Sequence, residues 1–259
     1  MLDLICRICT GSARIVFSGT VIGDVLADYA RCDECESLFV LRPTWLDRAY
    51  SSQAYKDYMR AFDRDAAAHE WQGAFAWPII QQALPQRPCR TLDWGPGNGW
   101  LVERLMAAGH EAWGYEKYDW TGPASAHTTG RIVGHLGDAP GQFDLVSAIE
   151  VLEHTLRPGV VLEQMAERLT EPGIAVVSTA LYDGHGPDWY YLAREYGQHI
   201  TFPSAKGLHM CAQKAGLRWE CTVTGASQNE RDYPIHILSR GGFDRARLDG
   251  TPWRIAWRS

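Results

Sequence analysis

The sequence contains no long hydrophobic run and no excess of basic residues. None of its apolar stretches approaches the roughly 20 residues that a transmembrane helix needs, so we expect no membrane partner. Lys and Arg number 25 against 31 Asp and Glu, for a formal net charge of −6, which disfavours a sequence-independent grip on nucleic acid. Residues 1–6 lack the basic start of a signal peptide. We therefore expect a cytoplasmic protein, whose seven cysteines stay reduced unless they bind a metal.

What the chain does contain is the composition of an ordinary globular protein, with 46% hydrophobic and 22% charged residues. Its 259 residues suffice for one substantial domain and a small module. The 11 Trp and 11 Tyr are a high count. Such a surplus serves core packing and also suits a pocket for a flat or apolar ligand.

Four zones follow one another along the chain. Residues 1–43 hold four cysteines among short β-like segments, and residues 44–88 have the apolar spacing of a helical linker or lid. Over residues 89–240, strand-like and helix-like segments alternate, which predicts an α/β domain with a largely parallel sheet. The predicted strands are 90–94, 111–115, 131–135, 143–149, 174–179, 218–224 and 234–238, and the predicted helices are 100–108, 160–169 and 204–215. The tail 241–259 shows no clear pattern.

The strand at 90–94 contains Asp93 and leads into Gly95, Gly97 and Gly99. Glycines let a backbone turn sharply and approach a ligand where a Cβ would collide, and the amides at the start of the next helix face that ligand. Glu116 ends the second strand, 23 residues after Asp93, at the offset where an acid meets the ribose of a bound nucleoside. The pattern predicts a nucleotide-binding loop.

A dinucleotide site is the competing interpretation of this loop. The dinucleotide motif reads Gly-x-Gly-x-x-Gly, whereas here the third glycine comes one residue early and Trp100 stands at the later position. Asp93 would repel a pyrophosphate but suits S-adenosylmethionine (SAM), which carries a cationic sulfonium and an amino group. A glycine-rich turn without any ligand is the remaining alternative, and the pairing with Glu116 argues against it.

Four segments occur in the order found in class I SAM-dependent methyltransferases: Asp93-x-Gly95-x-Gly97-x-Gly99, Glu116, Phe143-Asp-Leu-Val146 and Val151-Leu-Glu-His154. The chain resembles that family over about residues 90–220, and is most similar to its small-molecule group, which includes ubiquinone-type and sugar or natural-product enzymes. The resemblance implies a Rossmann-like fold, with a mostly parallel seven-stranded sheet and helices on both faces.

The same resemblance implies roles for individual residues. Asp93, Gly95, Gly97 and Gly99 would hold the methionine end of SAM, Glu116 its ribose and Glu150 its amino acid moiety. Asp138 is the candidate for the adenine amino group. Residues 148–154 contain neither the Asn/Asp-Pro-Pro-Tyr nor the Pro-Cys run of nucleobase methyltransferases, which disfavours a nucleobase acceptor.

Two histidines are candidates for a general base, which the reaction needs only if the acceptor must lose a proton. His154 lies just beyond the fourth strand, at the carboxyl edge where open α/β sheets bind ligands. His199 lies in a segment similar to the family's aromatic-rich insert, where Trp189, Tyr190 and Tyr191 could line a substrate pocket. Each histidine could equally serve packing or loop structure alone.

Cys6-x-x-Cys9 and Cys32-x-x-Cys35 form two pairs of the kind that present four thiolates to one tetrahedral zinc ion. With no open ligand position the zinc would be structural, and its binding would stabilise a module too small for a core of its own. The segment is similar to the zinc ribbon that precedes some natural-product methyltransferases, although Glu36 stands where glycine commonly follows the second pair.

Methyl transfer to a small-molecule acceptor is the function that these features favour. One alternative is a ribosomal RNA methyltransferase whose zinc ribbon reads RNA, but residues 1–43 carry four arginines against six acids, a poor surface for RNA. The other is a non-catalytic SAM-binding scaffold that uses the ribbon to dock a partner protein. The loop and Glu116 allow SAM binding in all three.

Overall fold

The computed structural model describes residues 4–51, 75–117, 130–225 and 234–258. The chain divides into two compact units: residues 1–61, 152–163 and 180–215 form the first, and residues 62–151, 164–179 and 216–259 form the second. Residues 52–74, most of the predicted linker, lie outside the described residues. The predicted boundaries after residues 43, 88 and 240 stay predictions. Within the described ranges, no helix combines the length and the apolarity that crossing a membrane requires.

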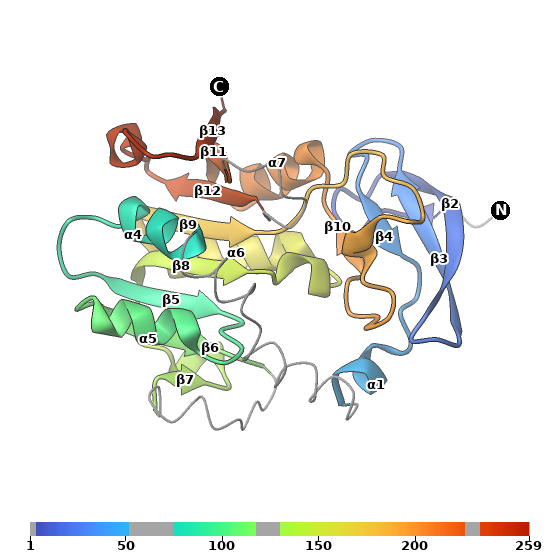
Figure 1. Ribbon diagram of the computed structural model, residues 1–259, viewed down its shortest axis with the longest axis horizontal. Helices are drawn as coiled ribbons and strands as arrows, with labels where there is room; N and C mark the ends of the chain where they lie inside the picture. Colours follow the sequence, from blue (N-terminus) through green and yellow to red (C-terminus); the bar gives the residue numbers. More distant parts are fainter. Residues whose placement is uncertain (1–3, 52–74, 118–129, 226–233, 259) are drawn as a thin grey trace. The chain divides into compact units, whose positions relative to one another are not determined.

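An eight-stranded sheet forms the centre of the second unit, in the order β13-β11-β12-β9-β8-β5-β6-β7 (Figure 1). The four pairings from β9 to β7 are parallel, and the three from β9 to β13 are antiparallel. The strands are β5 (Arg90–Trp94), β6 (Glu111–Tyr115), β7 (Ile132–Val133), β8 (Phe143–Ile149), β9 (Leu169–Ser178), β11 (Arg218–Thr224), β12 (Ile235–Arg240) and β13 (Arg254–Trp257). The parallel strands β5, β6, β8 and β9 bring their carboxyl ends to one edge of the sheet.

The prediction of a mostly parallel, seven-stranded sheet needs correction in both respects. The eighth strand, β13, comes from the tail that the sequence left unplaced, and it pairs with β11 from Cys221↔Trp257 to Thr224↔Arg254. Its residues alternate between exposed and partly buried, because a short edge strand packs on one side only. With β13 included, three of the seven strand pairings are antiparallel.

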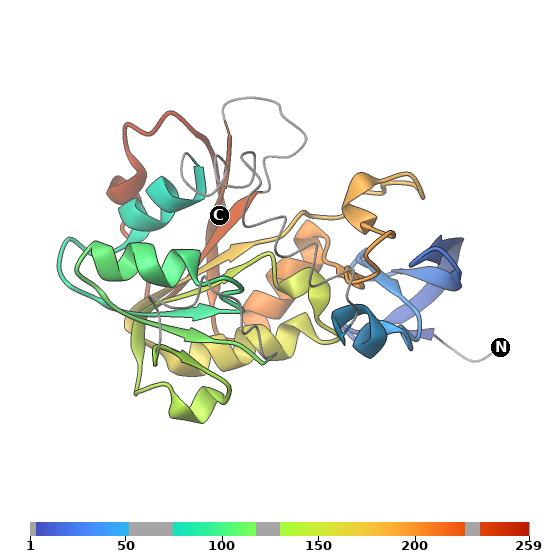
Figure 2. The ribbon, with the colours of Figure 1, turned by 60° about the horizontal axis from the view of Figure 1, so that its bottom comes forward.

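One face of this sheet is covered by α4 (Trp77–Ala83) and α5 (Trp100–Ala107) (Figure 2). Alternate residues of β9 and β12, such as Val176 and Ile237, and Leu145 of β8 belong to the same buried cluster as these helices. Burying one such side chain contributes about 1.5–3 kcal/mol. The other helical elements in the described part of this unit are η3 (Leu136–Asp138), η6 (Arg245–Leu248) and the end of α6 (Pro158–Arg168).

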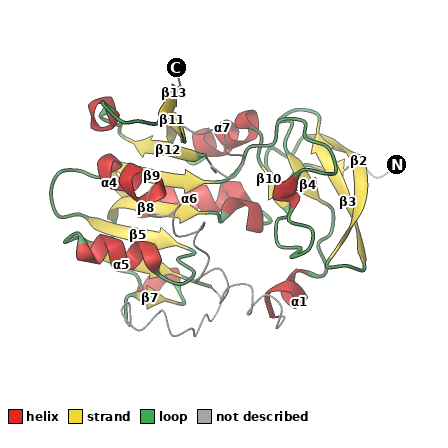
Figure 3. Cartoon of the chain, in the orientation of Figure 1, coloured by secondary structure: helices red, strands yellow, loops and turns green. Residues whose placement is uncertain are grey.

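The first unit is built on a five-stranded antiparallel sheet in the order β1-β2-β3-β4-β10 (Figure 3). The strands are β1 (Leu4–Ile5), β2 (Ser12–Val21), β3 (Val25–Cys32), β4 (Leu38–Val40) and β10 (Thr201–Phe202). Among its described residues, the helical elements are α1 (Leu46–Ser51), η4 (Leu152–His154), η5 (Tyr190–Leu192), α7 (Ala205–Lys214) and the start of α6.

Strand β10 joins this N-terminal sheet from far along the chain. It pairs with β4 through Thr201↔Phe39 and Phe202↔Leu38, and the Val40 amide donates to the Ile200 carbonyl at 2.8 Å. The sheet whose strands and loops carry the four clustered cysteines is therefore completed by residues that follow the fifth predicted strand.

Candidate active site

The glycine loop after β5 has the backbone that its sequence predicts. Gly95, Gly97 and Gly99 have φ angles of 71°, 53° and 82°, in the left-handed region that favours glycine. Gly95 also has no room for a side chain, because a Cβ there would lie 2.9 Å from Cγ2 of Val151. Gly99 is the N-cap of α5. The backbone thus favours glycine at all three positions, and Gly95 has no room for a larger residue unless Val151 moves.

Asp93 lies beneath this loop and is buried, with 2% of its surface exposed. The Ser147 hydroxyl donates a hydrogen bond of 2.7 Å to its Oδ1. Burial raises the pKa of Asp93 to about 7; the Ser147 bond opposes the shift and the charge of Glu116 adds to it. A cation bound beside this buried carboxyl would stabilise its ionised form, so the site favours a cationic ligand.

Two further carboxylates follow the neighbouring strands at the same edge of the sheet. Glu116 comes directly after β6, and its amide donates to the Val133 carbonyl at 3.0 Å. Glu150 comes directly after β8 with φ 53°, and its Oε1 accepts a 2.5 Å hydrogen bond from Ser178. With Asp93, the edge carries three acids around a glycine loop, a donor set that fits a cationic nucleoside such as SAM and opposes a pyrophosphate.

Asp138 is exposed at the end of η3. Nothing in its described surroundings bears on the adenine amino group, so this assignment stays a prediction. The roles of the glycines, Asp93, Glu116 and Glu150 toward SAM are likewise proposals, which their placement supports.

The two candidate histidines, 45 positions apart in sequence, lie together in the first unit. Their rings meet edge to face with centroids 4.7 Å apart. His199 Nδ1 lies 2.6 Å from the Tyr191 carbonyl, so it must be the protonated nitrogen, since a carbonyl can only accept. His154 Nδ1 forms a 3.0 Å hydrogen bond with the Tyr50 hydroxyl.

Burial keeps both rings neutral. It lowers the pKa of His199 to about 4, against the hydrogen bond to Tyr191. It also lowers the pKa of His154, with His199 adding to the shift and the backbone of Gln198 opposing it. The neighbouring Glu153 is fully buried, and its Oε1 lies 3.8 Å from His154 Nε2. At neutral pH the two imidazoles therefore offer lone pairs, beside a buried carboxyl.

The three predicted pocket aromatics differ in exposure. Tyr191 is 1% exposed and packs on His199 and Phe202. Tyr190 is 47% exposed. Trp189 is half-buried and stacks on His185 with centroids 4.4 Å apart and planes 6° from parallel. Only Trp189 and Tyr190 thus present ring surface outside the core.

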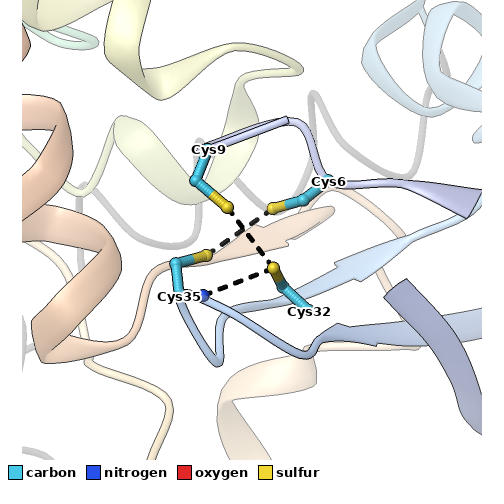
Figure 4. Close-up of side chains that lie close together, drawn as sticks. All are labelled: Cys6, Cys9, Cys32 and Cys35. Atoms are coloured by element: carbon cyan, nitrogen blue, oxygen red, sulfur yellow. Dashed lines mark hydrogen bonds between the residues drawn. The ribbon is translucent and has the colours of Figure 1, made fainter. Parts of the chain in front are cut away.

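The four N-terminal cysteines converge as the spacing predicts (Figure 4). Their Sγ atoms all lie within 4.8 Å of one another, with Cys6–Cys35 at 3.6 Å and Cys9–Cys32 at 3.4 Å. All are free thiols. A tetrahedral zinc ion with Zn–S distances of about 2.3 Å holds its sulfurs about 3.8 Å apart, so the cluster fits such an ion after small adjustments.

The loops that carry these cysteines have matching backbones. Amide groups point at the first sulfur of each pair: Ile8 N lies 3.4 Å from Cys6 Sγ, and Glu34 N lies 3.3 Å from Cys32 Sγ. Thr10 and Glu36, which follow the two pairs, both have φ 65°. Glu36 therefore adopts the conformation for which glycine is more common. Burial raises the pKa of Cys9 to about 11, a shift that a bound cation would reverse.

Several residues that hold the candidate site residues in place were not predicted from the sequence. Ser147 and Ser178 bond the acids Asp93 and Glu150 across neighbouring strands. Gly114 makes room for the loop, because a Cβ there would lie 2.8 Å from Cγ of Pro96. Tyr50 bonds a histidine 104 residues later. Only Gly114 left a local signal, as a glycine inside a predicted strand.

A sheet with this strand order, a glycine loop after its central strand and acids after the adjoining strands define a Rossmann-like, nucleoside-binding protein. A family model described as a methyltransferase domain matches residues 56–222. The chain therefore belongs to the methyltransferase-domain family.

Curated relatives and solved structures agree with this assignment. The chain is 30% identical to the ubiquinone biosynthesis O-methyltransferase of Dechloromonas aromatica over 141 residues, which cover 50% of this chain and 60% of that enzyme. The corresponding enzyme of Azorhizobium caulinodans is 26% identical over 187 residues, 67% of each chain. The chain thus spans less than two thirds of the first relative's length.

Among solved structures, the fold is similar to that of 1,6-didemethyltoxoflavin-N1-methyltransferase from Burkholderia thailandensis, with its substrate and S-adenosylhomocysteine bound. The TM-score is 0.57 at 16% identity, over 88% of this chain and 100% of that one. Magnesium protoporphyrin IX methyltransferase from Synechocystis, with bound SAM, gives 0.54 at 16% identity, over 77% and 97%. The chain has the class I SAM-dependent methyltransferase fold.

Proposed function

We propose that this protein transfers the methyl group of SAM to a small-molecule acceptor. The observation that carries the proposal is the set of three acids, Asp93, Glu116 and Glu150, around a glycine loop in which Gly95 has no room for a side chain. A buried acid with a raised pKa costs stability unless it binds a cation, and SAM is the cation that this family uses.

An oxygen acceptor is the choice that the relatives favour, since the curated matches are named O-methyltransferases. The exposed aromatic surface of Trp189 and Tyr190 suits a flat or apolar molecule. The net charge of −6 and the acidic balance of residues 1–43 disfavour RNA.

The transfer is an in-line displacement: the acceptor oxygen bonds to the methyl carbon as the C–S bond breaks and its electron pair goes to sulfur. Correct positioning supplies most of the acceleration in such a reaction. A hydroxyl acceptor must also lose its proton, and we assign the activation of that hydroxyl to the neutral His154–His199 pair.

Cys6, Cys9, Cys32 and Cys35 would hold a structural zinc ion, because four converging thiolates leave no position open for a substrate. The zinc would stabilise the first unit, whose sheet starts with strands of two and ten residues around a small core.

The experiment is to incubate the protein with a metabolite extract, total RNA and isotopically labelled SAM, and to follow the label by mass spectrometry. Label in a small molecule is the expected result. Label in RNA alone would overturn the proposal, and SAM binding without any S-adenosylhomocysteine formation would favour a scaffold. His154→Ala and His199→Ala then test the pair: full turnover at saturating substrate in either variant excludes that histidine as essential.

A further inference from the structure

The backbone around His199 accepts hydrogen bonds from the N-terminal residues 4–45. Three of its carbonyls take part: that of Arg194 accepts from the Ile22 amide at 2.9 Å, that of Gly197 from Trp45 Nε1 at 2.8 Å, and that of Ile200 from the Val40 amide at 2.8 Å. Gly197 also has no room for a side chain, because a Cβ there would lie 2.7 Å from Cγ1 of Ile22. The N-terminal residues therefore hold the main chain on both sides of His199.

Arg7 adds a bond from a side chain to the same main chain. It lies in the loop between the first two cysteines. Its guanidinium donates to two carbonyls, through Nη1 to that of Ile200 at 3.4 Å and through Nη2 to that of Val40. Arg7 is half-buried, with its Cζ 5.4 Å from the centroid of the Phe39 ring. A planar guanidinium presents its donors in a fixed geometry, so Arg7 holds β4 and the residue before β10 together.

The loop that carries Arg7 is itself held in place. The Cys6 amide donates to the Gly11 carbonyl at 2.9 Å, and the Thr10 amide donates to the Cys6 carbonyl at 3.1 Å. A side chain on a fixed loop loses less conformational freedom when it binds its partners. The cysteine loop therefore presents the guanidinium in position.

Ile200 transmits this contact to His199, its neighbour in sequence. Its carbonyl accepts from Arg7, and its amide donates to the Glu153 carbonyl at 2.8 Å. The ring of His199 is held through the bond from Nδ1 to the Tyr191 carbonyl, which leaves the lone pair on Nε2. A general base must lie about 2.6–3.2 Å from the group that it deprotonates, and a misplacement of about 1 Å can lower the rate about a hundredfold. The position of that lone pair depends on the backbone at Ile200.

We propose that Arg7 is a positioning residue for methyl transfer, which holds the Ile200 carbonyl and thereby sets the place of the His199 ring. Its effect on catalysis rests on the proposed function, in which His199 helps to activate the acceptor hydroxyl; its effect on the ring does not. The cysteine loop then has a second task beside the stability of the sheet, because it carries the arginine that orients this histidine.

Amide hydrogen exchange of the full chain tests the positioning without turnover. Arg7→Met keeps an unbranched side chain over Phe39 and removes its donors, so the peptide that covers residues 196–204 should exchange at least tenfold faster than in the wild type. Arg7→Lys, which keeps a charged donor, should show a smaller increase, and Arg14→Met, which changes an exposed arginine of β2, should show none. Helix α7 should keep its wild-type exchange in all three variants. Unchanged exchange at 196–204 in Arg7→Met, or an equal increase throughout the first unit, would overturn the inference.

The His199 ring supplies a second readout, which a loss of stability alone would not move. In protein labelled with ¹⁵N-histidine, the Nδ1–H signal of His199 is identified by its absence from His199→Ala. This signal should shift in Arg7→Met, shift less in Arg7→Lys and stay in place in Arg14→Met. An unmoved signal in Arg7→Met would contradict the proposal.

Turnover separates this inference from the proposed function. With labelled SAM and the metabolite extract, Arg7→Met should transfer the label at least tenfold more slowly at an unchanged SAM affinity, because the glycine loop and its acids belong to the second unit. Wild-type transfer by a variant whose His199 signal has moved would refute the catalytic part of the inference. A wild type that transfers no label would refute the proposed function, whereas the exchange and ring measurements would still decide whether Arg7 positions His199.

Discussion

Ser147 Oγ donates a 2.7 Å hydrogen bond to Asp93 Oδ1 between the parallel strands β8 and β5, where both residues are buried. This bond stabilises the ionised carboxyl, and burial opposes it more strongly, so that the pKa of Asp93 rises to about 7. The acid therefore changes charge near the pH at which a cell works, and two consequences can be measured.

The first consequence concerns stability without SAM. The pKa of Asp93 is higher in the folded protein than the usual 3.8. The contribution of this carboxyl to the free energy of unfolding is therefore fully present below about pH 4 and is lost as the pH rises through about 7. Asp93→Asn should therefore raise the melting temperature at pH 8 more than at pH 5, by the equivalent of a few kcal/mol. Asp183→Asn, on the surface, is the control. An equal effect of Asp93→Asn at both pH values would contradict the raised pKa.

The second consequence concerns SAM binding. A cation beside Asp93 favours the carboxylate, so at pH 7 binding should release part of a proton. Calorimetric titrations in two buffers of different ionisation enthalpy should give different apparent heats, and the affinity should fall as the pH drops below 7. Identical heats in both buffers would show that Asp93 stays in one protonation state.

Gly95→Ala should weaken SAM binding at least tenfold, because the new Cβ meets Val151 Cγ2 at 2.9 Å and the φ of 71° costs about 1–2 kcal/mol for alanine. Gly109→Ala is a matched control, with φ 86° and nothing within 4 Å of its Cβ; it should lose stability but bind SAM normally. Adding Val151→Ala to Gly95→Ala should recover the steric part only. Wild-type affinity of Gly95→Ala would mean that the loop does not approach SAM closely.

Cys32→Ser should lose the zinc ion and lower the melting temperature of the first unit by roughly 10 °C. Cys89→Ala, which changes an equally buried cysteine of the second unit, should keep one zinc per chain. Metal content measured by mass spectrometry and near-ultraviolet circular dichroism provide the two readouts. A zinc-free wild-type protein of unchanged stability would exclude the structural role.

The centre of the fold was predictable from the sequence because buried parallel strands are continuous apolar segments bounded by glycine or charge. The predicted bounds of three parallel strands, at 90–94, 111–115 and 143–149, agree with the structure, as do those of the antiparallel strand at 218–224. Strands β10 and β13 were missed, since strands of two and four residues are too short for a periodic pattern.

The candidate site was predictable only where the order of strands along the chain determines where a residue lies. The glycine loop and the acids after successive strands share one edge because parallel strands share a direction. The Tyr50–His154 bond and the meeting of His154 with His199 depend on tertiary packing between distant segments, which no local pattern encodes. Glu36 is a further example. It takes a left-handed position that glycine suits better, and the loop around Cys32 and Cys35 nevertheless forms.

The pairing of β4 with β10 also determines the order in which the first unit can form. Phe39 pairs with Thr201, which is synthesised 162 residues later. Most of the methyltransferase domain therefore leaves the ribosome before β4 can pair with β10. Until then the edge of β4 exposes unpaired amides and carbonyls, the kind of edge on which strands of other molecules pair. A fragment ending near residue 43 would keep that edge permanently, so the cysteine module is best produced and studied as part of the whole chain.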